Sequence, residues 1–170
     1  HGAVTVREAL GASLNIPAVQ AIEYAGVPDT IDLAHRVGIR EGLWRGENVC
    51  GLALTLGGGE VSLLELTNAY GTFANNGTYA AWTPVLDVRT ADGTVIYETD
   101  RERVAEQAPR VMYAEHAWEI SDVLSDPMPR RSTFGPESPL EFPELPDWQI
   151  ATKTGTSADW RDNWTIAYSP

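Results

Sequence analysis

Apolar residues recur at helical spacing along much of the chain. Ile31, Ala34 and Val37 fall on one helix face. The segments Thr5–Glu8 and Ser62–Glu65 match the capping-box pattern, in which a hydroxyl and a Glu three residues later satisfy the free amides of a first turn. The predicted helices run from Val6 to about Gly11, from Pro17 to a stop at Gly26, from Pro28 to a stop at Gly38, from Ser62 to a stop at Asn75-Asn76-Gly77, and from Ala114 to Leu124.

The remaining regular segments have the two-residue period of strands. Residues 85–90 and 94–98 are β-prone and are joined by Ala91-Asp92-Gly93, which predicts a hairpin. Near the end of the chain, residues 148–154 and 163–168 predict two further strands, whereas the proline-rich stretch 126–146 predicts a long surface loop. Helices that come first and a closing antiparallel pair give no βαβ rhythm. We therefore expect an α+β fold with helices packed on an antiparallel sheet.

Composition narrows the classes of function. The chain has 170 residues, a net charge of −12 and only 12 basic residues, which form no run, so we expect no nucleic-acid partner. No window approaches the ~18 consecutive apolar residues of a membrane helix. Cys50 is the only cysteine, which excludes an internal disulfide and a cysteine metal cluster. His1, His35 and His116 lie far apart in the sequence, and we expect neither a metal nor another cofactor.

The segment Lys153-Thr154-Gly155-Thr156 carries the first candidate chemistry, at the end of a predicted strand. A lysine there offers a positive charge to a substrate carboxylate, and the two threonine hydroxyls can donate hydrogen bonds beside it. Gly155 has no side chain, so a substrate can lie against the strand, where a free backbone N–H can stabilise an oxyanion in acyl transfer. The alternative is a solvated strand end that leads into a turn.

Ser13-Leu14-Asn15, between two predicted helices, is the second candidate. A hydroxyl can pass a proton, and an amide can both donate to and accept from a peptide bond. The alternative is that Asn15 caps the helix that follows, because Ser and Asn are favoured at helix ends.

These two segments together resemble the motifs of penicillin-binding proteins and class A β-lactamases, whose set is Ser-x-x-Lys, Ser-Asp-Asn and Lys-Thr-Gly. Leu14 stands where that set has Asp, but Ser-x-Asn with a variable centre is the usual form in the penicillin-binding proteins. The likeness extends to flanking sequence and follows the family order of class A, bifunctional penicillin-binding proteins. The similar stretches are residues 1–10 and 13–19, the segment Leu63-Leu64-Glu65-Leu66-Thr67-Asn68-Ala69-Tyr70-Gly71-Thr72-Phe73-Ala74-Asn75-Asn76-Gly77, and Ala151-Thr152-Lys153-Thr154-Gly155-Thr156-Ser157 with Asp162-Asn163-Trp164 and Tyr168-Ser169-Pro170.

The resemblance implies a peptidoglycan D,D-transpeptidase that cross-links stem peptides ending in D-Ala-D-Ala and binds β-lactams. It implies that Ser13 relays a proton, that Asn15 holds a substrate amide and that Lys153 sets the electrostatics. Thr154 and Thr156 would bind the terminal carboxylate, with the backbone N–H of Thr156 in the oxyanion hole. It also implies a location on the outer face of a bacterial cell membrane.

One family motif is missing from the sequence. Lys153 is the only lysine, and Ile150 stands three residues before it, so Ser-x-x-Lys does not occur. We therefore expect residues 1–170 to be part of one transpeptidase domain, truncated at both ends, with an incomplete sheet. The nucleophile would come from the upstream remainder of the domain, beyond which the resemblance implies a glycosyltransferase domain.

Two other functions stay open at this stage. A D,D-carboxypeptidase or β-lactamase-like serine hydrolase differs only in whether water or an amine resolves the acyl-enzyme. A non-catalytic penicillin-binding or sensor module would keep the fold without the nucleophile. Other polar segments favour structural roles: residues 57–60 lack the spacing of a phosphate loop and predict a turn, and Asp159 and Asp162 lie in a predicted turn, where Asp is common.

Overall fold

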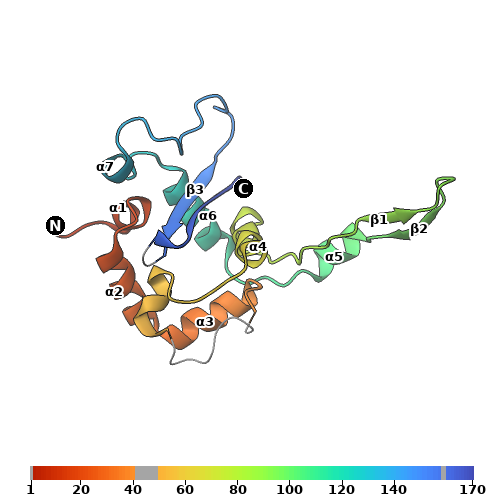
Figure 1. The fold of residues 1–170 in the computed structure, drawn as a ribbon, viewed down its shortest axis with the longest axis horizontal. Helices are drawn as coiled ribbons and strands as arrows, with labels where there is room; N and C mark the ends of the chain where they lie inside the picture. The colour runs from red at the N-terminus through yellow and green to blue at the C-terminus, as the bar shows by residue number, and fades with distance from the viewer. Residues whose placement is uncertain (1, 41–49, 158–159) are drawn as a thin grey trace.

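The computed structural model describes residues 2–40, 50–157 and 160–170. Helices dominate the first half of the chain, and the two sheets follow (Figure 1). The elements are α1 (Val6–Gly11), α2 (Asn15–Ala25), α3 (Val27–Arg36), the 3-10 helix η2 (Gly51–Leu56), α4 (Leu63–Ala74), β1 (Asp87–Arg89), β2 (Val95–Glu98), α5 (Arg101–Gln107), α6 (Ala114–Ser125), α7 (Arg131–Phe134), β3 (Ala151–Thr156) and β4 (Asn163–Tyr168).

Local sequence signals set the helix ends. The hydroxyl of Thr5 accepts the amide of Glu8 while the Glu8 side chain accepts the amide of Thr5, so the predicted capping box is complete. Ser62 caps α4 by accepting the amide of Glu65. Gly26 directly follows the last residue of α2. It adopts a φ of 90°, a backbone conformation that a side chain would disfavour.

The strands form two antiparallel pairs within the described residues, β1 with β2 and β3 with β4. The β1–β2 hairpin projects far from the rest of the molecule (Figure 1). The β3–β4 pair lies in the body, where α6 packs on β3 and α4 packs on β4. The predicted α+β arrangement of helices on an antiparallel sheet is confirmed.

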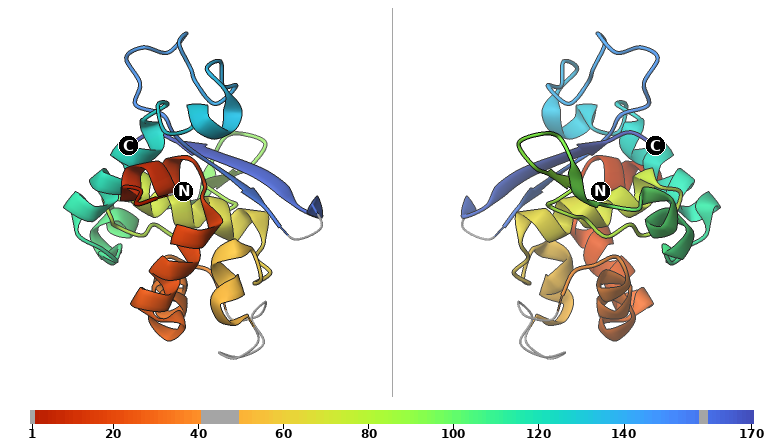
Figure 2. Two further views of the ribbon diagram at one scale, coloured as in Figure 1. Left: turned by 90° about the vertical axis from the view of Figure 1, so that its left-hand side faces the viewer. Right: turned by 90° about the vertical axis from the view of Figure 1, so that its right-hand side faces the viewer.

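Buried apolar residues hold the helices and the β3–β4 pair together. The main core cluster joins Val37 and Ile39 after α3 to Ala69 of α4 and Val111 before α6. Ala117 and Leu124 of α6, Ala151 of β3 and Ile166 of β4 are also buried, and α6 packs on β3. In the views of Figure 2, α2 and α3 lie below the β3–β4 pair and the loop after α7 lies above it.

Three short helices were not predicted from the pattern. Asp100 caps α5, because its side chain accepts the amide of Arg103. No residue of α5 is buried, so the sequence shows no apolar face there. η2 and α7 have six and four residues, too few to give a helical period. Among the residues described, none of the helices has the length and apolar character needed to span a membrane.

Candidate functional site

One cavity of about 550 Å³ lies between the β3–β4 pair, the turn from α1 to α2, and α4. All six candidate residues from the sequence line it, from the two segments Ser13–Asn15 and Lys153–Thr156. The remaining lining residues are Thr55, Leu56, Gly57, Gly59, Glu60, Val61, Leu66, Tyr70, Ser157, Asp162, Trp164 and Ile166. The tertiary structure therefore brings together two motifs that are far apart in the sequence.

Ser13 occupies a strained position just after α1. The amide of Leu14 donates to the carbonyl of Ala9 and that of Ser13 to the carbonyl of Leu10, the two hydrogen bonds of a Schellman ending. That ending needs a left-handed residue, and Ser13, at φ 58°, fills the place where Gly is usual. Strain of this kind persists where surrounding contacts enforce it and is frequent at functional sites. The turn directs residues 13–15 along the cavity wall.

Asn15 is the first residue of α2 and is not its cap. The N-cap residue is Leu14, which has no side-chain capping bond. Asn15 is exposed and lines the cavity, so its amide is available to a ligand.

Lys153 projects from the middle of β3, opposite Ile166 of β4. Its Nζ donates to Ser13 Oγ at 2.7 Å and to the carbonyl of Thr154 at 2.6 Å. Burial lowers the pKa of the Lys153 ammonium, because a half-buried charge loses hydration. A lysine with a lowered pKa beside a hydroxyl is suited to proton exchange with it.

The rest of the segment runs along the strand edge. Gly155 pairs with Trp164 of β4, and a Cβ on Gly155 would meet no atom within 4 Å, so the space over it is open. Thr156 Oγ1 lies 3.4 Å from Asn163 Oδ1. Among the strands described, β4 is the only partner of β3, so the other edge of β3 stays available to an extended ligand.

The sequence did not predict that residues 57–60 form part of the cavity wall. It predicted only that they form a turn. Gly57 ends η2 in the left-handed conformation, at φ 88°, and a Cβ there would lie 3.6 Å from Ser157 Cα. Gly59 and Glu60 also line the cavity. The turn was predicted correctly, but its place across from β3 depends on the packing of η2 against α2 and α3.

Ser157 and Asp162 close the turn from β3 to β4. The Ser157 amide donates to the Asp162 carbonyl at 3.0 Å, the Asp162 amide to Ser157 Oγ at 3.0 Å, and Ser157 Oγ to Asp162 Oδ2 at 3.2 Å. Asp162 therefore has the structural role expected of it; its companion Asp159 lies outside the described residues. Trp164 lines the cavity, whereas Trp160 is 86% exposed and does not.

The charged side chains around the cavity are Lys153, Glu60 and Asp162. Within residues 2–40, 50–157 and 160–170, no three His, Cys, Asp or Glu side chains are grouped so that they could hold a metal ion. What these residues offer is an ammonium, hydroxyls, an amide and an open strand edge, which suit the binding of a peptide and proton transfer.

Comparison with protein families gives a match over the whole chain. Residues 1–170 match the family model described as the penicillin binding protein transpeptidase domain. The chain is 31% identical over 173 residues to penicillin-binding protein 1A of Clostridium botulinum (strain Langeland / NCTC 10281 / Type F). That alignment covers 100% of this chain and 19% of the relative, so the chain spans about a fifth of that relative's length.

Solved structures are similar in fold. Penicillin-binding protein PonA1 from Mycobacterium tuberculosis superposes with a TM-score of 0.73 at 20% identity, covering 100% of this chain and 46% of that one. Penicillin-Binding Protein 1A from Haemophilus influenzae gives a TM-score of 0.69 at 22% identity, covering 97% of this chain and 28% of that one. At these identities the likeness establishes the fold alone.

Proposed function

Because the chain belongs to the penicillin-binding protein transpeptidase domain family, we propose that it forms part of one D,D-transpeptidase domain, on the outer face of a bacterial cell membrane. The observation that carries the proposal is the 2.7 Å hydrogen bond from Lys153 Nζ to Ser13 Oγ. It joins the family's second and third motifs inside a cavity that has room for a peptide. The substrate is a peptidoglycan stem peptide that ends in D-Ala-D-Ala, and β-lactams compete for the same site.

The nucleophile of the proposed reaction is the serine of a Ser-x-x-Lys segment in the parent protein, outside residues 1–170. Its hydroxyl attacks the penultimate carbonyl of the donor stem, and the terminal D-Ala leaves as an amine. Ser13, hydrogen-bonded to Lys153, relays the proton of the attacking hydroxyl to the leaving amine and later takes a proton from the attacking amine. An amine of a second stem peptide then resolves the acyl-enzyme and forms the cross-link.

The remaining cavity residues bind the donor stem. Asn15 holds a substrate amide, and the hydroxyls of Thr154 and Thr156 hold the terminal carboxylate beside the Lys153 ammonium. The N–H of Thr156, on the open edge of β3, contributes half of the oxyanion hole, and the nucleophilic serine contributes the other half. The open space over Gly155 supports this placement, because an extended peptide needs close approach to the strand.

Intact-protein mass spectrometry after incubation with benzylpenicillin tests the proposal on two proteins, the 170-residue chain and the full-length parent. We expect one covalent adduct on the parent, none on the chain, and strongly slowed adduct formation in the parent that carries Lys153→Ala. A stoichiometric adduct on the chain would make one of its own serines the nucleophile and overturn the proposed site. No adduct on the parent would leave a non-catalytic module.

Resolution of the acyl-enzyme separates a transpeptidase from a D,D-carboxypeptidase or β-lactamase-like hydrolase. The parent is given a D-Ala-D-Ala stem peptide with and without an acceptor amine. We expect a cross-linked product when the amine is present; hydrolysis alone at every amine concentration would contradict the transfer reaction.

A further inference from the structure

Residues 129–133, which follow α6 and include the first three residues of α7, contact the chain immediately before both Ser13 and Lys153. The hydroxyl of Thr133 donates to the carbonyl of Ala12 at 2.9 Å. The Nη1 of Arg130 lies 3.4 Å from the carbonyl of Thr152, to which it donates. One five-residue segment therefore holds both halves of the Ser13–Lys153 pair.

Arg130 anchors this segment to α6. Its side chain is buried, and the same Nη1 donates to the carbonyl of Leu124 in the last turn of α6 at 2.6 Å. A guanidinium stays charged even where burial lowers its pKa, as it does here, so its hydrogen bonds to carbonyls are charge-assisted. Arg130 thus ties β3 to the end of α6.

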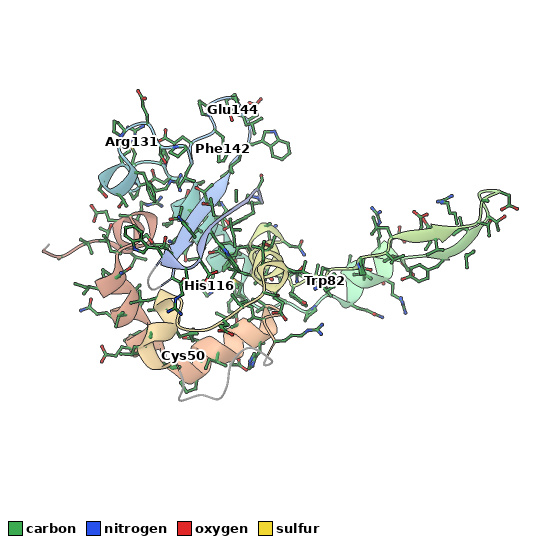
Figure 3. All side chains as sticks on the ribbon, in the orientation of Figure 1. Cys50, Trp82, His116, Arg131, Phe142 and Glu144 are labelled. Atoms are coloured by element: carbon green, nitrogen blue, oxygen red, sulfur yellow. The ribbon has the colours of Figure 1, made fainter. Side chains whose placement is uncertain are left out.

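Packing holds the other side of the segment against α1. A Cβ on Gly11 would lie 2.6 Å from the Cβ of Pro129, so only a glycine allows the proline ring this close. The segment also lies on the side of the molecule away from η2. Figure 3 shows Arg131 there, with Phe142 and Glu144 of the loop, at the opposite end from Cys50.

Each contact acts on the backbone of a site residue. The carbonyl of Ala12 and the amide of Ser13 share one rigid peptide plane, as do the carbonyl of Thr152 and the amide of Lys153. A hydrogen bond that holds either carbonyl in place therefore also holds the backbone amide of the site residue that follows it. Ser13 has particular need of this support, because its φ of 58° is strained.

We propose that Arg130 and Thr133 are positioning residues, which form a clamp that holds Ser13 within hydrogen-bond distance of Lys153. The proposal deepens the proposed function and rests on it for its catalytic meaning. Thr133 is exposed, so its hydroxyl can be removed without opening the core. Thr133→Val keeps the shape of the side chain and removes the donor. Thr133→Ser restores the donor. Ser132→Ala is the matched control, because within the described residues that hydroxyl donates to the carbonyl of Pro129 and not to a residue next to the site.

The first test needs no enzymatic activity. Lys153 is the only lysine, so the chain labelled with [ε-13C]lysine gives a single lysine signal that reports on its ammonium. We expect Thr133→Val to shift this signal as Ser13→Ala does, and the double variant to match Ser13→Ala. Thr133→Ser and Ser132→Ala should superpose on the unsubstituted chain. A Thr133→Val signal that does not move, or that moves further in the double variant, overturns the clamp.

The second test measures the rate of acylation by benzylpenicillin in the full-length parent, together with its melting temperature. We expect Thr133→Val to slow acylation by roughly tenfold, since small misplacements of reacting groups cost one to two orders of magnitude. In the Ser13→Ala background the same change should cost nothing more, because Thr133 acts through Ser13. An equal slowing in both backgrounds overturns the proposal in favour of a general packing role.

The two tests also separate this proposal from the proposed function. If the unsubstituted parent is not acylated, the transpeptidase assignment fails, and the lysine signal alone decides whether the clamp positions Ser13. If the parent is acylated and the lysine signal ignores Thr133, the clamp fails and the transpeptidase assignment stands.

Discussion

The hydroxyl of Tyr168 on β4 lies 3.0 Å from the hydroxyl of Ser121 on α6. Ser121 gives its one proton to the carbonyl of Ala117 at 2.8 Å, so Tyr168 is the donor to Ser121. The Tyr168 ring also stacks on Phe73 and meets the edge of Tyr70, both on α4. Tyr168 therefore joins the sheet to both helices that support the cavity.

Tyr168→Phe should reduce the free energy of unfolding by about 0.5–1.5 kcal/mol at neutral pH, the usual net contribution of one hydrogen bond. Burial raises the pKa of Tyr168 and of Tyr70. The unfolded chain then ionises these groups before the folded chain does, so stability is lost as the pH rises above about 10. Tyr168→Phe has no phenol at this position, so it does not lose the part of the stability that ionisation of Tyr168 removes at alkaline pH.

Urea unfolding of both proteins from pH 7 to pH 11 checks this expectation. The two stability curves should converge at alkaline pH. A difference that stays constant through pH 11 would show that the Tyr168 phenol is not held neutral by its surroundings.

Gly11→Ala should destabilise the chain, because the new Cβ would overlap the rigid ring of Pro129. Overpacking of this kind costs about 1–3 kcal/mol. Gly71 in α4 is the matched control: it is exposed, and a Cβ there would meet nothing within 4 Å. Gly71→Ala should therefore stabilise the chain by about 0.5–1 kcal/mol through helix propensity. Thermal unfolding gives both values, and equal shifts in the same direction would refute the close contact between Gly11 and Pro129.

Lys153→Met should abolish the proposed catalysis and yet raise the melting temperature at pH 7. The lowered pKa of Lys153 means that folding places a charged ammonium where burial opposes it. As the pH rises through the folded-state pKa, the folded lysine becomes neutral before the unfolded one, and the unsubstituted chain gains stability. The difference in stability between the methionine variant and the less stable unsubstituted chain should therefore shrink as the pH rises to about 10.5, the ordinary lysine pKa.

Melting curves of both proteins at pH 7, 9 and 10 provide the check. Comparing the two proteins cancels the alkaline loss from the tyrosines, which they share. A methionine variant that is less stable at pH 7 would mean that the two hydrogen bonds of the ammonium outweigh its loss of hydration.

Ser157→Ala should loosen the turn between β3 and β4, because it removes both hydrogen bonds of the Ser157 hydroxyl with Asp162. We expect a loss of about 1 kcal/mol in stability. Acylation of the parent should slow severalfold, since Thr156 adjoins the turn. Ser157→Thr keeps the hydroxyl and should restore both properties. Acylation at the unsubstituted rate in Ser157→Ala would show that the turn does not influence the site.

Much of the local structure could be predicted because it depends on residues close together in the chain. The capping box at Thr5 involves a partner three residues away, and Gly26 ends α2 through its own backbone freedom. The alternation of residues 163–168 predicted β4 for the same reason. α7 lacked such a signal, since it is one turn long and the partners of Thr133 in α7 and of Arg130 just before it, Ala12 and Thr152, lie in distant segments.

The sequence by itself determined the helices and strands with clear periodicity, the two motifs and the family they resemble. Only the tertiary structure decided that Ser13 and Lys153, 140 positions apart, share a hydrogen bond. It also decided that Gly57 faces β3 and that residues 129–133 hold both halves of the pair. The physical reason is that a cap or a turn is stabilised by its neighbours in the chain. A contact across the fold is stabilised only when every helix and strand between its two ends has packed.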